Sequence, residues 1–109
     1  MAERTQLWLF HAKRARITEF AGYQMPLWYE GIIPEHMAVR EAVGVFDVSH
    51  MGRLLVEGPG AEGLLDMTTT NDVIGLEPGR SQYSLMCNQD GGIVDDVVVL
   101  RLAEERFLL

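Results

Sequence analysis

The sequence predicts an α+β fold in which short helices pack on a mostly antiparallel sheet. The main reason is a pair of apolar runs within residues 83–100, which flank the turn-forming sequence Asn-Gln-Asp-Gly-Gly and so have the pattern of a β-hairpin. A second reason is that helix-like and strand-like segments alternate in short pieces along the rest of the chain. The 109 residues, 48% of them hydrophobic and 23% charged, have the size and composition of a globular domain that can bury a core.

The N-terminal part is expected to hold one helix and one strand. Thr5 has a side chain suited to an N-cap, and Leu7 and Phe10 follow at helical spacing, which predicts a short helix. Residues 16–20 alternate between polar and apolar side chains and predict a short strand. Residues 21–26 contain glycine and proline, so we expect an irregular segment there.

A second helix is predicted over Pro34–Val43. Pro34 suits the first helical position, and Gly44 stands where a glycine commonly ends a helix. The mainly apolar residues 45–48 and 53–57 then predict two short strands.

A third helix is predicted over residues 60–67, opened by Pro59. Three of its apolar side chains are expected to turn inward, namely Leu64, Leu65 and Met67. Residues 106–109 look like the opening of a further strand. Because a natural C-terminus seldom stops inside an apolar strand, we expect residues 1–109 to be the N-terminal segment of a longer, multi-domain chain.

Charge and composition exclude several classes of partner. A net charge of −7 argues against nucleic-acid binding, which needs a basic surface, and no apolar run reaches membrane-spanning length. The only local basic excess is Lys13-Arg14-Arg16, which is too short for a polyanion site but could meet an acidic partner protein. Cys87 is the single cysteine, which excludes an intramolecular disulfide and fits a reducing compartment.

The second strand of the hairpin carries two adjacent carboxylates, Asp95 and Asp96. Both faces of this strand are apolar, which is the pattern of a strand covered on both sides, so we expect at least one carboxylate to lie among apolar neighbours. A buried charge is costly unless it is paired, so it usually has a partner or a function. The alternative is that both aspartates lie at the solvent-exposed end of the strand, near the turn. There they would accept hydrogen bonds from turn amides or form ion pairs with Arg101 or Arg53.

Other kinds of site are not indicated. His11, His36 and His50 are far apart in sequence and have no Cys or carboxylate at ligand spacing, so no metal site is predicted. The sequence has no phosphate-binding loop. Ser49 and His50 are adjacent, a placement that rarely aligns a nucleophile with its base, so we interpret Ser49 as a turn or cap residue.

Three blocks, at residues 20–26, 47–52 and 91–96, together resemble a known family. In this order and spacing they are similar to the N-terminal portion of the aminomethyltransferase (T-protein) of the glycine cleavage system. The resemblance covers essentially the whole chain and includes the opening helix, the run HMAVREAVGVFDVSHMG, Thr70–Val73 and the strand at 83–88. The chain departs from the family at Tyr23, where a tryptophan is usual, and at Leu100, where many members have an aromatic residue.

The resemblance implies a function. The family transfers the aminomethyl group carried on lipoylated H-protein to tetrahydrofolate, releases ammonia and uses no metal. It implies that Asp96 is the catalytic carboxylate and also contacts the folate, and that the other folate-lining residues are Met51, Leu55 and Tyr83. It also implies a cytoplasmic protein, or a mitochondrial one in a eukaryote. Residues that grip the glutamate tail of folate lie beyond Leu109 in this family, so we expect the fragment alone to be inactive and to bind folate weakly or not at all.

The residues themselves are compatible with that chemistry. A carboxylate near N10 of folate can accept a proton, orient the amine and stabilise developing positive charge, and apolar surroundings strengthen each effect. Asp95, on the opposite face, is expected to be structural and bonded to backbone or to an arginine. Two interpretations of Met51 and Tyr83 stay open. In one, their side chains form a flat wall that contacts the pterin, and in the other, they simply pack in the core. The alternatives for the whole chain are a folate-dependent demethylase, the folate-binding half of a dehydrogenase, an iron–sulfur assembly factor, or a non-catalytic binding module.

Overall fold

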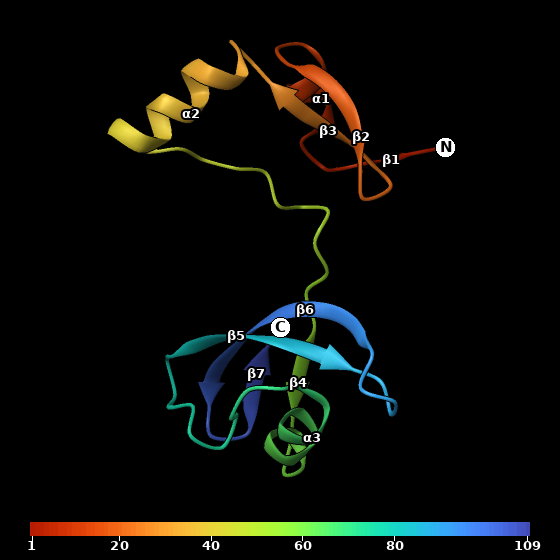
Figure 1. The fold of residues 1–109 in the computed structure, drawn as a ribbon, viewed down its shortest axis with the longest axis vertical. Helices are drawn as coiled ribbons and strands as arrows, with labels where there is room; N and C mark the ends of the chain where they lie inside the picture. Colours follow the sequence, from red (N-terminus) through yellow and green to blue (C-terminus); the bar gives the residue numbers. More distant parts are fainter. The chain divides into compact units, whose positions relative to one another are not determined.

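The computed structural model describes residues 1–109, which form two compact units, Met1–Met51 (unit 1) and Gly52–Leu109 (unit 2). Figure 1 labels their elements. Unit 1 contains β1 (Glu3–Arg4), α1 (Trp8–Ala12), β2 (Arg16–Phe20), β3 (Tyr23–Trp28) and α2 (Ile32–Glu41). Unit 2 contains β4 (Leu55–Glu57), α3 (Ala61–Thr68), β5 (Ser81–Cys87), β6 (Ile93–Ala103) and β7 (Arg106–Leu108). No helix is long and apolar enough to cross a membrane.

Unit 1 is a three-stranded sheet in the order β1-β3-β2, with α1 packed on β2 and β3 (Figure 1). The prediction of an irregular segment at 21–26 is wrong, because Ala21 and Gly22 form a tight turn and β3 follows directly. Both turn residues have positive φ, 50° and 81°, which is the backbone that a two-residue hairpin loop requires. Pro26 is tolerated in β3 because it lies beyond the two residues paired with β1 and beside a bulge in β2.

The helix predicted over residues 34–43 forms, but α2 begins two residues earlier and ends two residues earlier. Pro34 is the third residue of α2, still within the first turn, where backbone N–H groups have no partner inside the helix. The start is fixed by Glu35, whose Oε1 accepts hydrogen bonds from the N–H groups of residues 29–31 at 2.6 to 3.0 Å. No residue of α2 is buried.

Two further expectations for unit 1 are wrong. Residues 45–48 are not a strand, since no other segment pairs with them, and Val45 is 98% exposed. Thr5 does not cap α1 through its side chain, because its hydroxyl instead donates a hydrogen bond to Asp47 at 3.2 Å. A sequence window cannot show that this contact, 42 residues away, competes with the cap.

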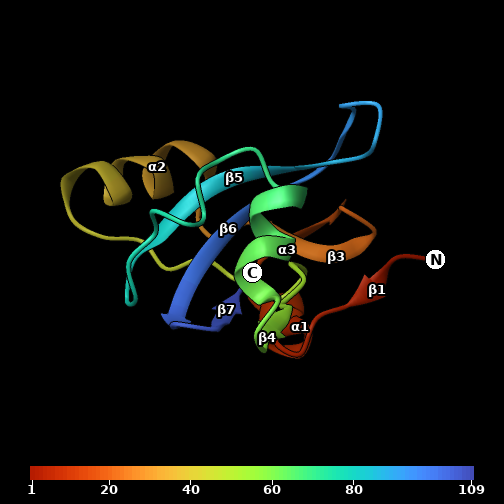
Figure 2. The same cartoon turned by 90° about the horizontal axis from the view of Figure 1, so that it is seen from below.

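Unit 2 is a four-stranded antiparallel sheet in the order β4-β7-β6-β5, with α3 against one face (Figures 1 and 2). The predicted hairpin is confirmed as β5 and β6, and the predicted strand at 106–109 is confirmed as β7. The strand expected over 53–57 is present in its second half, as β4.

The core of unit 2 lies between α3 and the sheet. Phe107 and Val99 are fully buried, and Leu65 of α3 is 3% exposed. The inward orientation predicted for Leu64 and Met67 is wrong, because they are 48% and 78% exposed. The short helix presents only a narrow stripe to the sheet, formed by Ala61 and Leu65 at i, i+4.

Arg101 joins three parts of unit 2. It is 7% exposed, and its guanidinium donates to the carbonyls of Leu76 and Glu104 at 2.9 and 2.8 Å. The same group pairs with Glu62 of α3 at 2.6 Å and lies over the ring of Phe107. The arginine therefore ties α3, the loop after it and the β6–β7 turn to the core.

Candidate functional site

The pairing of strands divides the side chains of the unit 2 sheet between two faces. Leu55 of β4 pairs with Leu108 of β7, and Leu108 pairs with Leu100 of β6. Direct partners share a face and alternate residues of one strand do too, so Leu55 lies on the same face as Asp96. We call this the open face, and it carries Leu55, Tyr83, Leu85, Asp96, Val98, Leu100 and Leu108, together with the polar residues Ser81, Glu57 and Arg106. Three of the four predicted folate contacts therefore share one sheet face.

The opposite side is the core face, which packs on α3. It carries Val56, Val97, Val99, Arg101 and Phe107. The expectation that β6 is covered on both sides is wrong for its first half, because residues 93–96 are all exposed. The physical reason is length: β6 has eleven residues, β7 pairs with it only from Leu100 onward, and α3 spans eight residues. The start of β6 thus pairs only with β5 and extends past the core.

Asp96 and Tyr83 are in contact on the open face. The Tyr83 hydroxyl donates a hydrogen bond to Asp96 Oδ2 at 3.0 Å, across a diagonal of the β5–β6 pair. This bond to the carboxylate, with burial and the negative charge of Asp96 adding to it, raises the pKa of Tyr83. Tyr83 is 59% exposed, and Asp95 and Asp96 are both exposed, so the expectation that at least one of the two carboxylates is buried is wrong in this chain.

Asp95 has a backbone hydrogen bond, which is one of the two kinds of partner that were expected for it. Its carboxylate accepts a hydrogen bond from the backbone N–H of Asp96 at 3.0 Å. Arg101, offered above as a partner for the two aspartates, instead binds Glu62 and two backbone carbonyls. The hydrogen bond that Asp95 accepts therefore comes from the backbone of the residue whose side chain bonds Tyr83.

The open face offers an acid–base group on an apolar surface. Val98 and Leu55 are 52% and 49% exposed, so large apolar side chains are accessible on the face that holds the Tyr83–Asp96 pair. A carboxylate can accept a proton or a hydrogen bond, and a phenol can donate one or stack on a ring. No group of three or more His, Cys, Asp or Glu side chains forms a cation site in the structure.

Met51, the fourth predicted folate contact, is the last residue of unit 1. It ends a turn in which its N–H donates to the carbonyl of Val48 at 3.0 Å. Its side chain is 53% exposed, which excludes the reading of Met51 as a core residue of this chain. The same conclusion holds for Tyr83.

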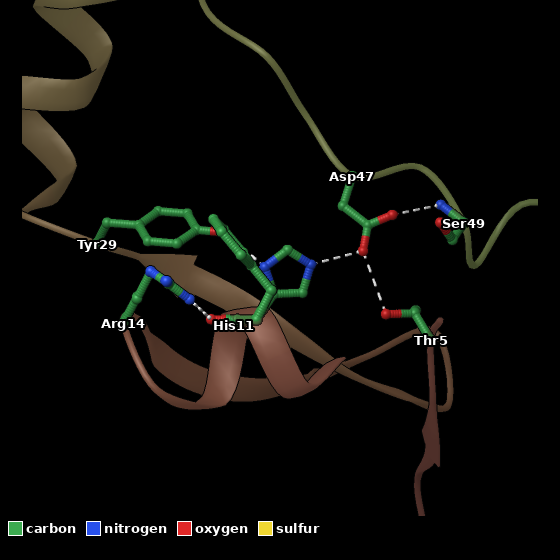
Figure 3. A network of polar contacts seen from close by, with 7 residues as sticks. Thr5, His11, Arg14, Tyr29, Asp47 and Ser49 are labelled. Atoms are coloured by element: carbon green, nitrogen blue, oxygen red, sulfur yellow. Dashed lines mark hydrogen bonds and ion pairs between the residues drawn. The ribbon is translucent and has the colours of Figure 1, made fainter. Parts of the chain in front are cut away.

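A polar network that sequence reasoning missed lies in unit 1 (Figure 3). His11 lies between Tyr29 and Asp47, with Nδ1 at 2.5 Å from the Tyr29 hydroxyl and Nε2 at 2.8 Å from Asp47 Oδ2. The side chains of His11 and Asp47 are 4% and 3% exposed. The two residues are 36 positions apart in the chain, and no motif spacing links them.

The electrostatics of the network fix its hydrogen-bond directions. Hydrogen bonds from Ser49, chiefly from its side chain, and from His11 and Thr5 hold the pKa of Asp47 well below its usual range, outweighing the effect of burial. An ionised carboxylate only accepts, so His11 Nε2 donates to Asp47. In the neutral imidazole Nδ1 is then the acceptor of the Tyr29 hydroxyl hydrogen.

An open pocket of about 620 Å³ lies beside this network, between β3, α2 and residues 43–47. Its wall is mainly apolar, with Tyr29 and Asp47 among the polar residues that line it. None of the four predicted folate contacts lines this pocket. All residues that line this pocket belong to unit 1.

Comparison with known proteins identifies relatives of the chain. Residues 8–109 match the family model described as the GCVT N-terminal domain. The chain is 54% identical over 95 residues to an aminomethyltransferase of Chloroherpeton thalassium, covering 87% of the chain and 26% of that protein. It is 50% identical over 108 residues to one of Thermus thermophilus, covering 98% and 31%.

A solved structure shows the same fold. The crystal structure of the glycine cleavage system aminomethyltransferase T from Bartonella henselae matches 99% of this chain with a TM-score of 0.87 and 37% sequence identity. The match covers 30% of that protein, so the chain spans less than a third of the length of the relatives it resembles. The family match over residues 8–109 shows that this chain belongs to the GCVT N-terminal domain family.

Proposed function

We propose that this chain is the N-terminal, folate-contacting part of a glycine cleavage system aminomethyltransferase. The complete protein would transfer the one-carbon unit of the aminomethyl group on lipoylated H-protein to tetrahydrofolate and release ammonia. Support comes from family membership and from relatives that are named aminomethyltransferases. The observation that carries the proposal is the Tyr83–Asp96 pair on an accessible apolar sheet face that also holds Leu55.

In the proposed mechanism Asp96 is the proton acceptor. Its carboxylate would take the hydrogen bond of the folate N10 amine, orient the lone pair of that nitrogen toward the incoming carbon, and accept its proton as the carbon–nitrogen bond forms. The negative charge would also stabilise the positive charge that develops on the transferred carbon. A second bond, from the carbon to N5 of tetrahydrofolate, would close the methylene bridge as the bonds of that carbon to the amino nitrogen and to the carrier sulfur break. The protons lost by N10 and N5 would leave on ammonia and on the carrier thiol.

Tyr83 and Leu55 would hold the pteridine. The hydroxyl of Tyr83 already bonds Asp96, so the phenol can keep the carboxylate oriented while its ring offers a surface for stacking. Leu55, on the same face, supplies apolar contact. The resemblance adds Met51 to the folate contacts and H-protein as the carrier, and a cytoplasmic location is part of the same proposal.

Reconstitution with the complete gene product tests this function. The protein would be mixed with aminomethylated, lipoylated H-protein and tetrahydrofolate, and ammonia and methylenetetrahydrofolate would be measured together. We expect the two products in equal amounts, with the rate unchanged by a metal chelator. Oxidation of an N-methylated amine with tetrahydrofolate and without H-protein would instead assign the chain to a demethylase or dehydrogenase relative. Tetrahydrofolate binding without either reaction would identify a binding module.

A further inference from the structure

Residues 47–51 of unit 1 are anchored at their first residue by a buried carboxylate. Asp47 Oδ2 accepts hydrogen bonds from His11 at 2.8 Å and from the Thr5 hydroxyl at 3.2 Å, while Oδ1 accepts the N–H of Ser49 at 2.8 Å. Figure 3 shows these contacts converging on the one side chain. The segment is thereby attached to α1 and to the chain before it, both in unit 1.

The other end of the segment is held by aromatic contacts. The ring of His50 packs edge-on against Phe20, with centroids 5.5 Å apart and planes at 82°, and lies tilted at 58° to the ring of Tyr23 with centroids 6.5 Å apart. Phe20 and Tyr23 flank the β2–β3 turn, which the sheet of unit 1 keeps in place. The N–H of Met51 then closes the turn on the carbonyl of Val48.

Residues 45–48 pair with no strand, so strand pairing does not position Met51. The contacts of Asp47, His50 and the Met51 N–H position it within unit 1 instead. We propose that His11 is a positioning residue for Met51: through its bond to Asp47 it fixes the segment that presents the exposed methionine to tetrahydrofolate. The part of this inference that concerns tetrahydrofolate rests on the proposed function.

The buried charge favours a positioning role for the pair. A buried carboxylate is costly to desolvate, so it is kept where directional hydrogen bonds satisfy its oxygens, and those bonds specify one geometry. Asp47 accepts hydrogen bonds from Thr5, from His11 and from both the backbone and the side chain of Ser49, all within unit 1, and His11 has a second partner in Tyr29. Displacing Asp47 would therefore move the four residues that follow it.

The geometry of imidazole supplies a matched pair of variants. The side-chain nitrogen of glutamine can take the place of Nε2, which is the atom that bonds Asp47. The nitrogen of asparagine takes the place of Nδ1, on the Tyr29 side, and does not reach Asp47. His11→Gln should keep the segment in place, and His11→Asn should release it.

The experiment uses the complete gene product in two measurements. The first is the NMR resonance of the Met51 methyl group without ligand, which we expect to shift in His11→Asn and to stay near its wild-type position in His11→Gln. The second is the dissociation constant for tetrahydrofolate, which we expect to rise about tenfold in His11→Asn and less than threefold in His11→Gln. In a Met51→Ala background the effect of His11→Asn on this constant should disappear, because residues that act through one shared backbone segment are not additive.

Each outcome decides the inference. An unmoved methyl resonance in His11→Asn, an unchanged dissociation constant, or an equal rise in the Met51→Ala background would overturn it. A shifted resonance in a protein whose wild type does not bind tetrahydrofolate would overturn the proposed function instead. Should His11→Asn fail to fold, Thr5→Val removes a single bond to Asp47, and a smaller shift and a roughly threefold rise are expected.

Discussion

The Tyr83 hydroxyl donates a hydrogen bond to Asp96 Oδ2 at 3.0 Å, from one strand of the hairpin to the next. The bond holds a carboxylate and a phenol together on a face where both are accessible. It joins two residues that the family resemblance assigns to folate, and it gives the carboxylate a fixed direction before any ligand arrives.

The titration of Tyr83 should report this contact. Because the carboxylate raises the pKa of Tyr83, the bond contributes stability below the ordinary tyrosine pKa of about 10 and loses that contribution as pH rises through the folded value. In Asp96→Asn the pKa of Tyr83 should fall toward about 10. Ultraviolet absorbance against pH measures it, with Tyr83→Phe identifying the signal. An identical titration curve for Tyr83 in both proteins would show that the bond does not form in solution.

Arg101 should carry a large share of the stability of unit 2. Arg101→Met leaves Glu62 and two backbone carbonyls without their partner, so we expect a loss of about 2–4 kcal/mol in the free energy of unfolding. Urea denaturation, followed through the NMR resonances of Phe107, measures the unfolding of unit 2 separately from that of unit 1.

Arg106→Met is the matched control. Arg106 pairs with Glu57 at 3.3 Å, and the two side chains are 54% and 59% exposed, so its removal should cost less than about 1 kcal/mol. Equal losses in the two variants would contradict the role given to the buried arginine.

Unit 1 should lose stability in acid through Asp47. The pKa of Asp47 is lowered in the folded chain, so the carboxylate contributes stability above its unfolded pKa of about 4, and this contribution is lost as pH falls below that value. Asp47→Asn should be less stable at pH 7 and should show a flatter stability curve below about pH 4. Thermal unfolding at a series of pH values provides the test, and parallel curves for variant and wild type would refute the assignment.

The 109-residue polypeptide by itself should bind tetrahydrofolate weakly or not at all. Ligand sites enclose most of a ligand's surface, whereas the open face has Leu55 and Val98 about half exposed. Isothermal titration calorimetry with the polypeptide measures the affinity directly. A micromolar dissociation constant would show that the residues described above already form a sufficient site.

The sequence allowed local elements to be predicted wherever the signal was local. The Asn-Gln-Asp-Gly-Gly turn between apolar runs identified the β5–β6 hairpin, and the apolar residues at 106–109 identified β7. The β2–β3 turn was missed because Ala21, with φ of 50°, is not a usual residue for that backbone.

The features that could not be predicted from the sequence depend on contacts between residues that are distant in the chain. The apolar residues on both faces of β6 did not reveal that β7 pairs with it only from Leu100 onward, so the exposure of residues 93–96 in this chain was not predicted. The partnership of His11 with Asp47 joins segments 36 residues apart and leaves no periodic trace. By contrast, the shared face of Tyr83 and Asp96 follows from strand alternation once the register is known.

The most direct test compares two neighbouring amides in the complete gene product. Asp96→Asn should lower the rate of methylene transfer by about 10²–10⁴-fold while tetrahydrofolate still binds within a few-fold of wild type, because the amide cannot accept the proton. Asp95→Asn keeps an oxygen for the Asp96 N–H and should transfer at nearly the wild-type rate. Unchanged transfer in Asp96→Asn would contradict the account.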